Sequence, residues 1–244
     1  MRTLILTGLL FAVPALAGDE LSLDIDADRI TVSGISSGAH MATQLHIAYS
    51  DVFSGAALLS GGPYNCANNS LVTAMRKCMT NTDTPLPVAQ IASGIREAAA
   101  AGAIADPENL ADDRVWLFRG TQDSKISALV HWAAAELYAE FVPADGIRRV
   151  DGIDADHVFP ARGQGNDCHE IVPPYVGDCD YDAAGELLSF LYPGLDQPAS
   201  EEVAGLHRVE LPGAVGFCVV APLSEDGTRP RVGLLTDVPR AGAT

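Results

Sequence analysis

Segments with strand and helix character alternate along most of this 244-residue chain. Short β-branched or apolar runs, each closing on glycine or a polar residue, are followed by longer helical patterns. This alternation predicts an α/β fold, in which a mostly parallel sheet carries helices on both faces. Strands are expected at 29–33, 53–62, 113–120 and 147–153, and helices at 39–49, 88–101, 126–141 and 181–192.

The first 17 residues have the pattern of a secretory signal peptide. One basic residue precedes an apolar run over 4–13, and Ala15 and Ala17 form an A-x-A cleavage site. The run is too short to remain as a membrane-spanning anchor, and no other stretch approaches that length. We therefore expect cleavage near Ala17 and a secreted protein, extracellular or periplasmic, without a membrane anchor.

Composition narrows the choice of partners. The chain has 32 acidic and 15 basic residues, a net charge of -17, and no basic cluster that could neutralise phosphates, so nucleic acid is not an expected partner. The remaining residues, 18–244, are expected to form one domain whose tail is less regular from about residue 197. The sequence leaves the oligomeric state open.

Five cysteines follow the predicted cleavage site, in a compartment where disulfides persist. The simplest arrangement is two local bridges, Cys66–Cys78 and Cys168–Cys179, with Cys218 left over. No C-x-x-C or paired-histidine spacing is present, so neither a metal nor another cofactor is expected.

The stretch "GISSG" at 34–38 matches G-x-S-x-G between a predicted strand and a predicted helix. In that context a tight turn raises the central serine above the sheet, and the flanking glycines avoid clashes. Ser36 is thus the candidate nucleophile, and the Ser37 N–H at the helix N-terminus is the candidate oxyanion donor. The alternative is that both serines only cap the helix.

An activated serine needs a base and an orienting acid, which in open α/β sheets lie in loops after the strands. Asp123 follows the third predicted strand and His157 follows the fourth, giving the chain order Ser, Asp, His of α/β-hydrolases. Asp123 has an alternative role as a turn or cap residue, and His169 is the rival base. Three other residues are weaker candidates: His40 is expected to pack within its helix, and Asp154 and Asp156 lie too close to His157 in sequence.

Four stretches carry a family resemblance: "GISSGAHMATQLHIAYSDVFSGAALLSGGPYNC", "VWLFRGTQDSKI", "DHVFP" and "CDYDAAGELLSFLYPGL". Together they resemble the catalytic domain of secreted poly(3-hydroxybutyrate) depolymerases, over about residues 28–195. The resemblance implies a circularly permuted α/β-hydrolase with its nucleophile near the N-terminus. It also implies that Ser36, Asp123 and His157 form a catalytic triad for a cofactor-free serine esterase. The expected substrate is a polyester, cleaved through an acyl-enzyme to hydroxyalkanoate oligomers or monomers.

The chain departs from the family's pattern near its end. Family members carry a His-Gly-Cys segment that supplies the second oxyanion donor, and this sequence has none. The tail is therefore expected to be diverged or truncated. Two alternatives to the depolymerase follow: a carboxylesterase for small soluble or carbohydrate-linked esters, and a non-catalytic remnant of the family.

Overall fold

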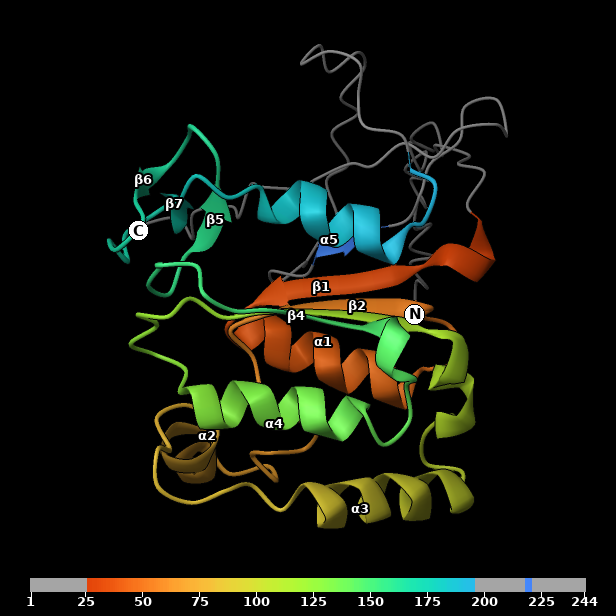
Figure 1. The fold of residues 1–244 in the computed structure, drawn as a ribbon. Coiled ribbons are helices and arrows are strands. Elements are labelled where there is room, and N and C mark those ends of the chain that lie inside the picture. Colours follow the sequence, from red (N-terminus) through yellow and green to blue (C-terminus); the bar gives the residue numbers. More distant parts are fainter. Residues whose placement is uncertain (1–25, 196–217, 221–244) are drawn as a thin grey trace, which may run out of the picture.

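The computed structural model describes residues 26–195 and 218–220. The predicted signal peptide, its cleavage site and most of the tail lie outside the described residues. Within them, a five-stranded sheet has the order β4-β3-β2-β1-β8, and its first four strands in the sequence run parallel (Figure 1). β8 pairs antiparallel with β1. The strands are β1 (Thr31–Ile35), β2 (Gly55–Leu59), β3 (Arg114–Phe118), β4 (Ile147–Val150) and β8 (Cys218–Val220).

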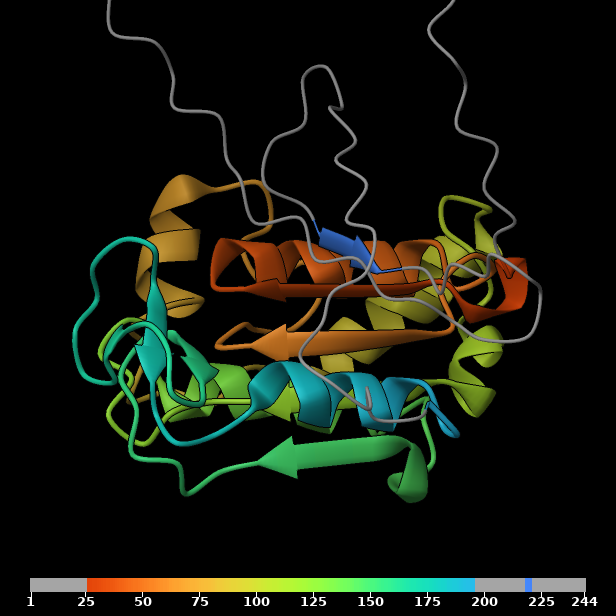
Figure 2. The same ribbon diagram turned by 90° about the horizontal axis from the view of Figure 1, so that it is seen from above.

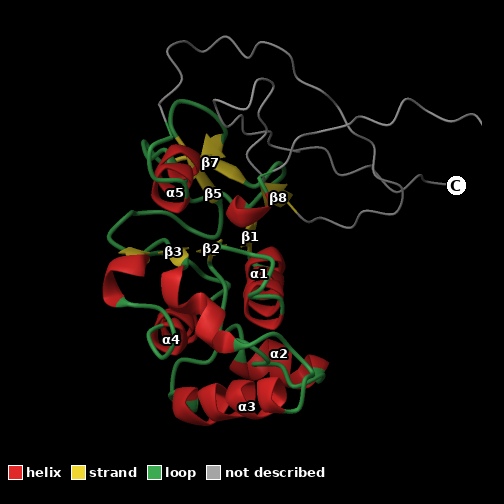
Figure 3. Cartoon of the chain, turned by 90° about the vertical axis from the view of Figure 1, so that its right-hand side faces the viewer, coloured by secondary structure: helices red, strands yellow, loops and turns green. Residues whose placement is uncertain are grey.

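Helices cover both faces of this sheet, as the alternating pattern predicts. The first, third and fourth α-helices lie on one side, and the fifth lies on the other (Figures 1 and 3). The α-helices are α1 (Ser37–Ala48), α2 (Leu71–Lys77), α3 (Val88–Ala100), α4 (Ala128–Tyr138) and α5 (Ala183–Leu191). Three 3-10 helices connect other elements: η1 (Ala27–Arg29), η2 (Pro107–Asp112) and η3 (Ala144–Gly146).

A second, three-stranded sheet lies on the same side as α5 (Figure 3). Its order is β5-β7-β6, from β5 (Phe159–Ala161), β6 (Asn166–Asp167) and β7 (Val176–Asp178). The sequence predicts a loop here, because strands of two or three residues among Asp, Gly and Pro are too short to show an alternating pattern.

The central strands are buried on both faces, which explains why they have continuous apolar sequences. All five residues of β2 are buried, and successive side chains of β2 and β3 point to opposite faces. Each fully buried Leu, Val or Phe side chain stabilises the fold by about 2 kcal/mol. One core cluster, against α1 and α4, contains Ala56, Leu58, Val115 and Leu117, and the other, against α5, contains Ala57, Leu59, Trp116 and Phe118.

The parallel strands point to one common edge of the sheet. Figure 2 shows the arrowheads of β1, β2 and β4 directed to the same edge, with β8 directed the opposite way. Loops that leave these strands therefore meet at this edge, where ligands bind in open α/β sheets.

The passage from β1 to α1 brings two backbone segments into close contact. A Cβ atom at Gly34 would lie 2.4 Å from the backbone carbon of Gly38, so this position accepts no side chain. At Gly38 an added Cβ would meet nothing within 4 Å. The expectation that the flanking glycines avoid clashes is thus confirmed at Gly34 and wrong at Gly38, because a side chain there would point into open space.

Both predicted disulfides, Cys66–Cys78 and Cys168–Cys179, are present. The first closes the segment that carries α2, and the second ties the segment before β7 to its end. The described residues contain no cluster of side chains able to hold a metal ion, and no helix among them is long and apolar enough to cross a membrane.

The contrast between the two motif glycines predicts different stabilities. Gly34→Ala should lower the free energy of unfolding by about 2 kcal/mol or more, because the new methyl group overlaps backbone. Gly38→Ala should leave it unchanged or slightly raised, because alanine favours a helix. Thermal unfolding monitored by circular dichroism measures both, and equal midpoints for the two variants would contradict the prediction.

Candidate active site

Ser36 occupies the sharp turn between β1 and α1 in a strained backbone conformation, with φ 58° and ψ -120°. A positive φ is uncommon for a residue other than glycine and concentrates at functional sites. Its N–H donates to the Leu59 carbonyl at 2.9 Å, which fixes the turn to the end of β2. Ser36 takes the N-cap position of α1, but its side chain makes no capping hydrogen bond. The hydroxyl is therefore not engaged in the capping role that was the alternative.

Ser37 is the first residue of α1 and is exposed. The N–H groups in the first turn of a helix have no acceptor within the helix, and the helix dipole favours negative charge beside them. The local backbone thus provides a donor one residue after Ser36.

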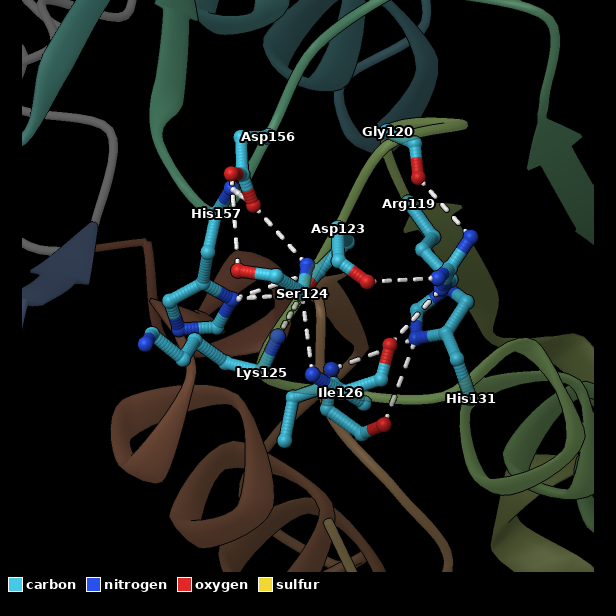
Figure 4. A network of polar contacts seen from close by, with 10 residues as sticks. Arg119, Gly120, Asp123, Ser124, Lys125, Ile126, His131, Asp156 and His157 are labelled. Carbon is cyan, nitrogen blue, oxygen red and sulfur yellow. Dashed lines mark hydrogen bonds and ion pairs between the residues drawn. The ribbon is translucent and has the colours of Figure 1, made fainter. Parts of the chain in front are cut away.

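Asp123 and His157 are brought into direct contact from two separate loops (Figure 4). His157 Nδ1 lies 3.0 Å from one carboxylate oxygen of Asp123 and 3.1 Å from the other. Both residues are buried, with 7% and 8% of their surfaces exposed. Since an ionised carboxylate only accepts hydrogen bonds, Nδ1 carries a proton and donates it to Asp123. The second ring nitrogen, Nε2, does not take part in this contact.

The carboxylate of Asp123 is held in its ionised form. Burial alone would raise its pKa, but the hydrogen bonds from His157 and from the Ile126 N–H outweigh burial and lower the pKa to about 2. The N–H groups of Lys125 and Ile126 donate to Oδ1 at 2.9 and 2.8 Å. Asp123 therefore also fills the turn role that the sequence analysis offers as its alternative, and the same carboxylate serves both purposes.

The two loops run side by side because their backbones are hydrogen-bonded beyond the ends of β3 and β4. Thr121 N–H donates to the Ile153 carbonyl at 2.9 Å, and Gln122 N–H donates to the Ala155 carbonyl at 3.1 Å. At Gly120 an added Cβ would lie 2.1 Å from the Ala155 carbonyl oxygen, so only glycine permits this approach.

Two charged residues that the sequence analysis does not assign to the site hold these loops. The Arg119 guanidinium donates at 2.8 Å to three carbonyls, those of Gly120, Asp123 and Ile126 (Figure 4). Asp156 accepts N–H groups from both loops. A charged residue at the end of an apolar strand was the only sequence signal for Arg119, and Asp156 gave none beyond its position before His157.

The rival histidine, His169, does not reach this pair. It is half exposed, and its ring nitrogens face Asp154 at 3.5 Å and Asp167 at 3.3 Å. His40 packs against the backbone after β2, where a Cβ at Gly62 would lie 2.5 Å from its ring. Burial lowers the pKa of His40, which favours a neutral ring.

A cavity of about 550 Å³ opens beside Ser36, a size typical of small-molecule sites. Its walls come from α1, from the disulfide-closed segment between Cys66 and Cys78, and from Ile126 next to the acid loop. Most of the lining is apolar. The side chains that face it include Ser36, His40, Met41, Gln44, Leu71, Ala74, Met79 and Ile126.

The structure thus places all four predicted site residues at the same edge of the sheet, and joins two of them. Asp123 and His157 are hydrogen-bonded, and Ser36 and Ser37 line the cavity with Ile126. Within the described residues, no hydrogen bond links Ser36 to His157.

The chain is similar in sequence to depolymerases of poly(3-hydroxybutyrate). The chain is 40% identical over 172 residues to a poly(3-hydroxybutyrate) depolymerase of Delftia acidovorans, covering 70% of this chain and 35% of the relative. It is 30% identical over 190 residues to a polyhydroxybutyrate depolymerase of Talaromyces funiculosus, covering 75% and 54%. The match therefore spans about half or less of these relatives' length. No family model matches the sequence.

The fold is similar to a solved structure from the same group of proteins. A crystal structure of a PHB depolymerase from Penicillium funiculosum aligns with a TM-score of 0.64 and 29% identity, covering 72% of this chain and 55% of that one. A serine-to-alanine variant of a PHB depolymerase, complexed with an R3HB trimer, aligns equally well.

The lowered pKa of Asp123 predicts how stability depends on pH. A folded-state pKa of about 2, below the ordinary 3.8, stabilises the fold at neutral pH, and this contribution is lost as the pH falls through about 2. Between about pH 5 and pH 2 the free energy of unfolding of the wild type should fall by about 2 kcal/mol more than that of Asp123→Asn. Urea denaturation at a series of pH values measures this, with Asp51→Asn as an exposed control. Parallel curves for the wild type and Asp123→Asn would contradict it.

Proposed function

We propose that this chain, a relative of the poly(3-hydroxybutyrate) depolymerases in sequence and fold, is a serine esterase that hydrolyses polyesters of the poly(3-hydroxybutyrate) type. The observation that carries the proposal is the buried contact between His157 and Asp123, at the same sheet edge as a strained and uncapped Ser36. A base oriented by an acid, together with an exposed serine turn, is the arrangement that acyl transfer needs.

In the proposed mechanism, His157 Nε2 takes the proton of the Ser36 hydroxyl as Ser36 Oγ attacks an ester carbonyl. Asp123 holds the imidazole through Nδ1 and stabilises the positive charge that develops on it. The Ser37 N–H donates to the oxyanion. His157 then gives its proton to the departing alkoxide, leaving an acyl-enzyme on Ser36. A water molecule, deprotonated by His157, hydrolyses this ester and releases the hydroxyalkanoate.

We also propose that this α/β domain is a circularly permuted α/β-hydrolase. The nucleophile turn follows β1, the first described strand, and the strand that pairs with the outer edge of β1 is β8, late in the chain. Strands that usually precede the nucleophile would thus follow the rest of the domain. The two disulfides support export to an oxidising compartment, where such bonds persist.

The surface beside the cavity supports an apolar, extended substrate. Three residues of α2 leave large parts of their apolar side chains exposed: Leu71 78%, Val72 64% and Met75 52%. Leu71 also lines the cavity, so the exposed side chains continue from the cavity onto the outer surface. Apolar side chains exposed next to one another on a protein surface are typical of interaction sites.

A small-ester carboxylesterase is the second candidate. The cavity of about 550 Å³ can hold a short soluble ester, and the proposed chemistry at Ser36 is the same. A substrate panel separates this activity from depolymerisation. Covalent labelling of Ser36 by a fluorophosphonate separates both from a non-catalytic remnant.

The choice of Ser36 over Ser37 predicts unequal effects of two matched substitutions. Ser36→Ala should lower the release of soluble 3-hydroxybutyrate from an amorphous polymer suspension by about 1,000-fold or more, because the nucleophile is lost. Ser37→Ala should keep the activity within about threefold, because the proposed donor is a backbone N–H. Equal losses in the two variants, with folding intact by circular dichroism, would refute the assignment.

The exposed face of α2 predicts a difference between solid and soluble substrates. Val72→Ser combined with Met75→Ser should lower hydrolysis of the suspension by about fivefold to tenfold, because apolar contact with the solid is lost. Turnover of a soluble nitrophenyl ester should stay within about twofold. Tyr49→Ser with Val52→Ser, which changes exposed apolar residues near the end of α1, is the matched control. An equal loss on both substrates would count against a docking role for this face.

A further inference from the structure

Asp156 forms hydrogen bonds to both loops that carry the Asp123–His157 pair. Its Oδ1 accepts the backbone N–H of Ser124 at 2.8 Å and the backbone N–H of His157 at 2.8 Å. Its Oδ2 lies 3.4 Å from the Ser124 hydroxyl. Figure 4 shows the Asp156 carboxylate between the two loops, beside both members of the pair.

These contacts lie immediately next to the paired side chains. Ser124 directly follows Asp123, and His157 directly follows Asp156. The backbone bonds that join the loops earlier, at Thr121 and Gln122, stop short of Asp123. Next to the pair, one carboxylate oxygen that accepts from each loop therefore joins the two loops, in addition to the direct contact between Asp123 and His157.

The backbone of Asp156 is hydrogen-bonded to a segment that carries a disulfide. Its own N–H donates to the Cys168 carbonyl at 3.1 Å, and Cys168 is bridged to Cys179. The backbone of Asp156, and with it the loop that carries His157, is thus tied to a cross-linked segment.

We propose that Asp156 is a positioning residue, which keeps Asp123 and His157 at hydrogen-bonding distance and so keeps Nε2 of His157 directed for proton transfer. This inference rests on the proposed esterase function. The role belongs to geometry and not to charge, because the two strong bonds use a single oxygen, Oδ1. A misplacement of about 1 Å in a catalytic group can cost about 100-fold in rate.

Three variants test whether Asp156 acts through its position as a hydrogen-bond acceptor or through its charge. Asp156→Ala removes the acceptor, Asp156→Asn keeps one acceptor oxygen without the charge, and Asp154→Ala is the matched control. Asp154 is an exposed aspartate in the same loop. It also accepts a hydrogen bond from the other loop, from the Thr121 hydroxyl at 3.3 Å, but it contacts neither Ser124 nor the pair. Asp156→Leu, which has a similar volume and no acceptor, replaces Asp156→Ala if that variant does not fold.

The first measurement is steady-state hydrolysis of a soluble nitrophenyl ester. We expect Asp156→Ala to lower kcat by about 10- to 100-fold with KM changed by less than about twofold. Asp156→Asn should stay within about threefold of the wild type, as should Asp154→Ala. A kcat for Asp156→Ala equal to that of Asp154→Ala would overturn the proposal, and so would an equal loss in the Asn and Ala variants.

The second measurement does not depend on activity. The Nδ1 proton of His157, hydrogen-bonded to Asp123, should give a far-downfield proton NMR signal that Asp123→Asn removes. This signal should be weakened or lost in Asp156→Ala and kept in Asp156→Asn. A signal unchanged in Asp156→Ala would overturn the positioning role. If the wild type shows the signal but hydrolyses no ester, the proposed function fails while the positioning role is still decided by the Asp156 variants.

Discussion

The tight turn from β1 into α1 is the constraint on which the rest of the structure depends. Gly34 lets the end of the strand touch the helix backbone at Gly38, and Ser36 accepts a positive φ so that the chain can reverse within three residues. The Ser36 N–H is fixed to the end of β2. Because β1 lies between β2 and β8 in the sheet, this turn sets the position of α1, of the cavity wall and of the serine together.

The second requirement is that two loops from neighbouring parallel strands stay in contact after their strands end. Gly120 permits the approach, and backbone bonds from Thr121 and Gln122 continue it. Asp156 joins the two loops next to the paired side chains, while Arg119 stabilises the loop of Asp123 alone. The buried Asp123 gains enough from its hydrogen bonds to remain ionised despite burial. In the proposed mechanism, a base and an acid that are already hydrogen-bonded need little reorganisation when the substrate reacts.

The surface around the cavity is apolar, and this agrees with the proposed polyester substrate. The segment bridged by Cys66–Cys78 forms one wall of the cavity and also presents the exposed apolar side chains of α2. The bridge limits the conformations available to the segment that presents these side chains. An apolar cavity continuous with an apolar outer face suits a chain of repeating esters better than a charged or strongly polar ligand.

The sequence alone determined the order of the main strands and helices, both disulfides and the three residue types of the proposed triad, because each depends on local patterns: periodicity, cysteine spacing, and a serine between strand and helix. Only the tertiary structure decided that His157, and not His169, meets Asp123, that Gly34 rather than Gly38 is sterically required, and that Arg119 and Asp156 hold the loops. The small β5-β7-β6 sheet is likewise seen only in the tertiary structure, since its strands are too short to show an alternating sequence pattern. The contact of His157 with Asp123 and the bond of Asp156 to Ser124 join segments far apart in the chain, and no local pattern of residues specifies which loops will lie side by side. The steric requirement at Gly34 and the bonds of Arg119 are local, but they depend on a backbone conformation that residue types alone do not specify.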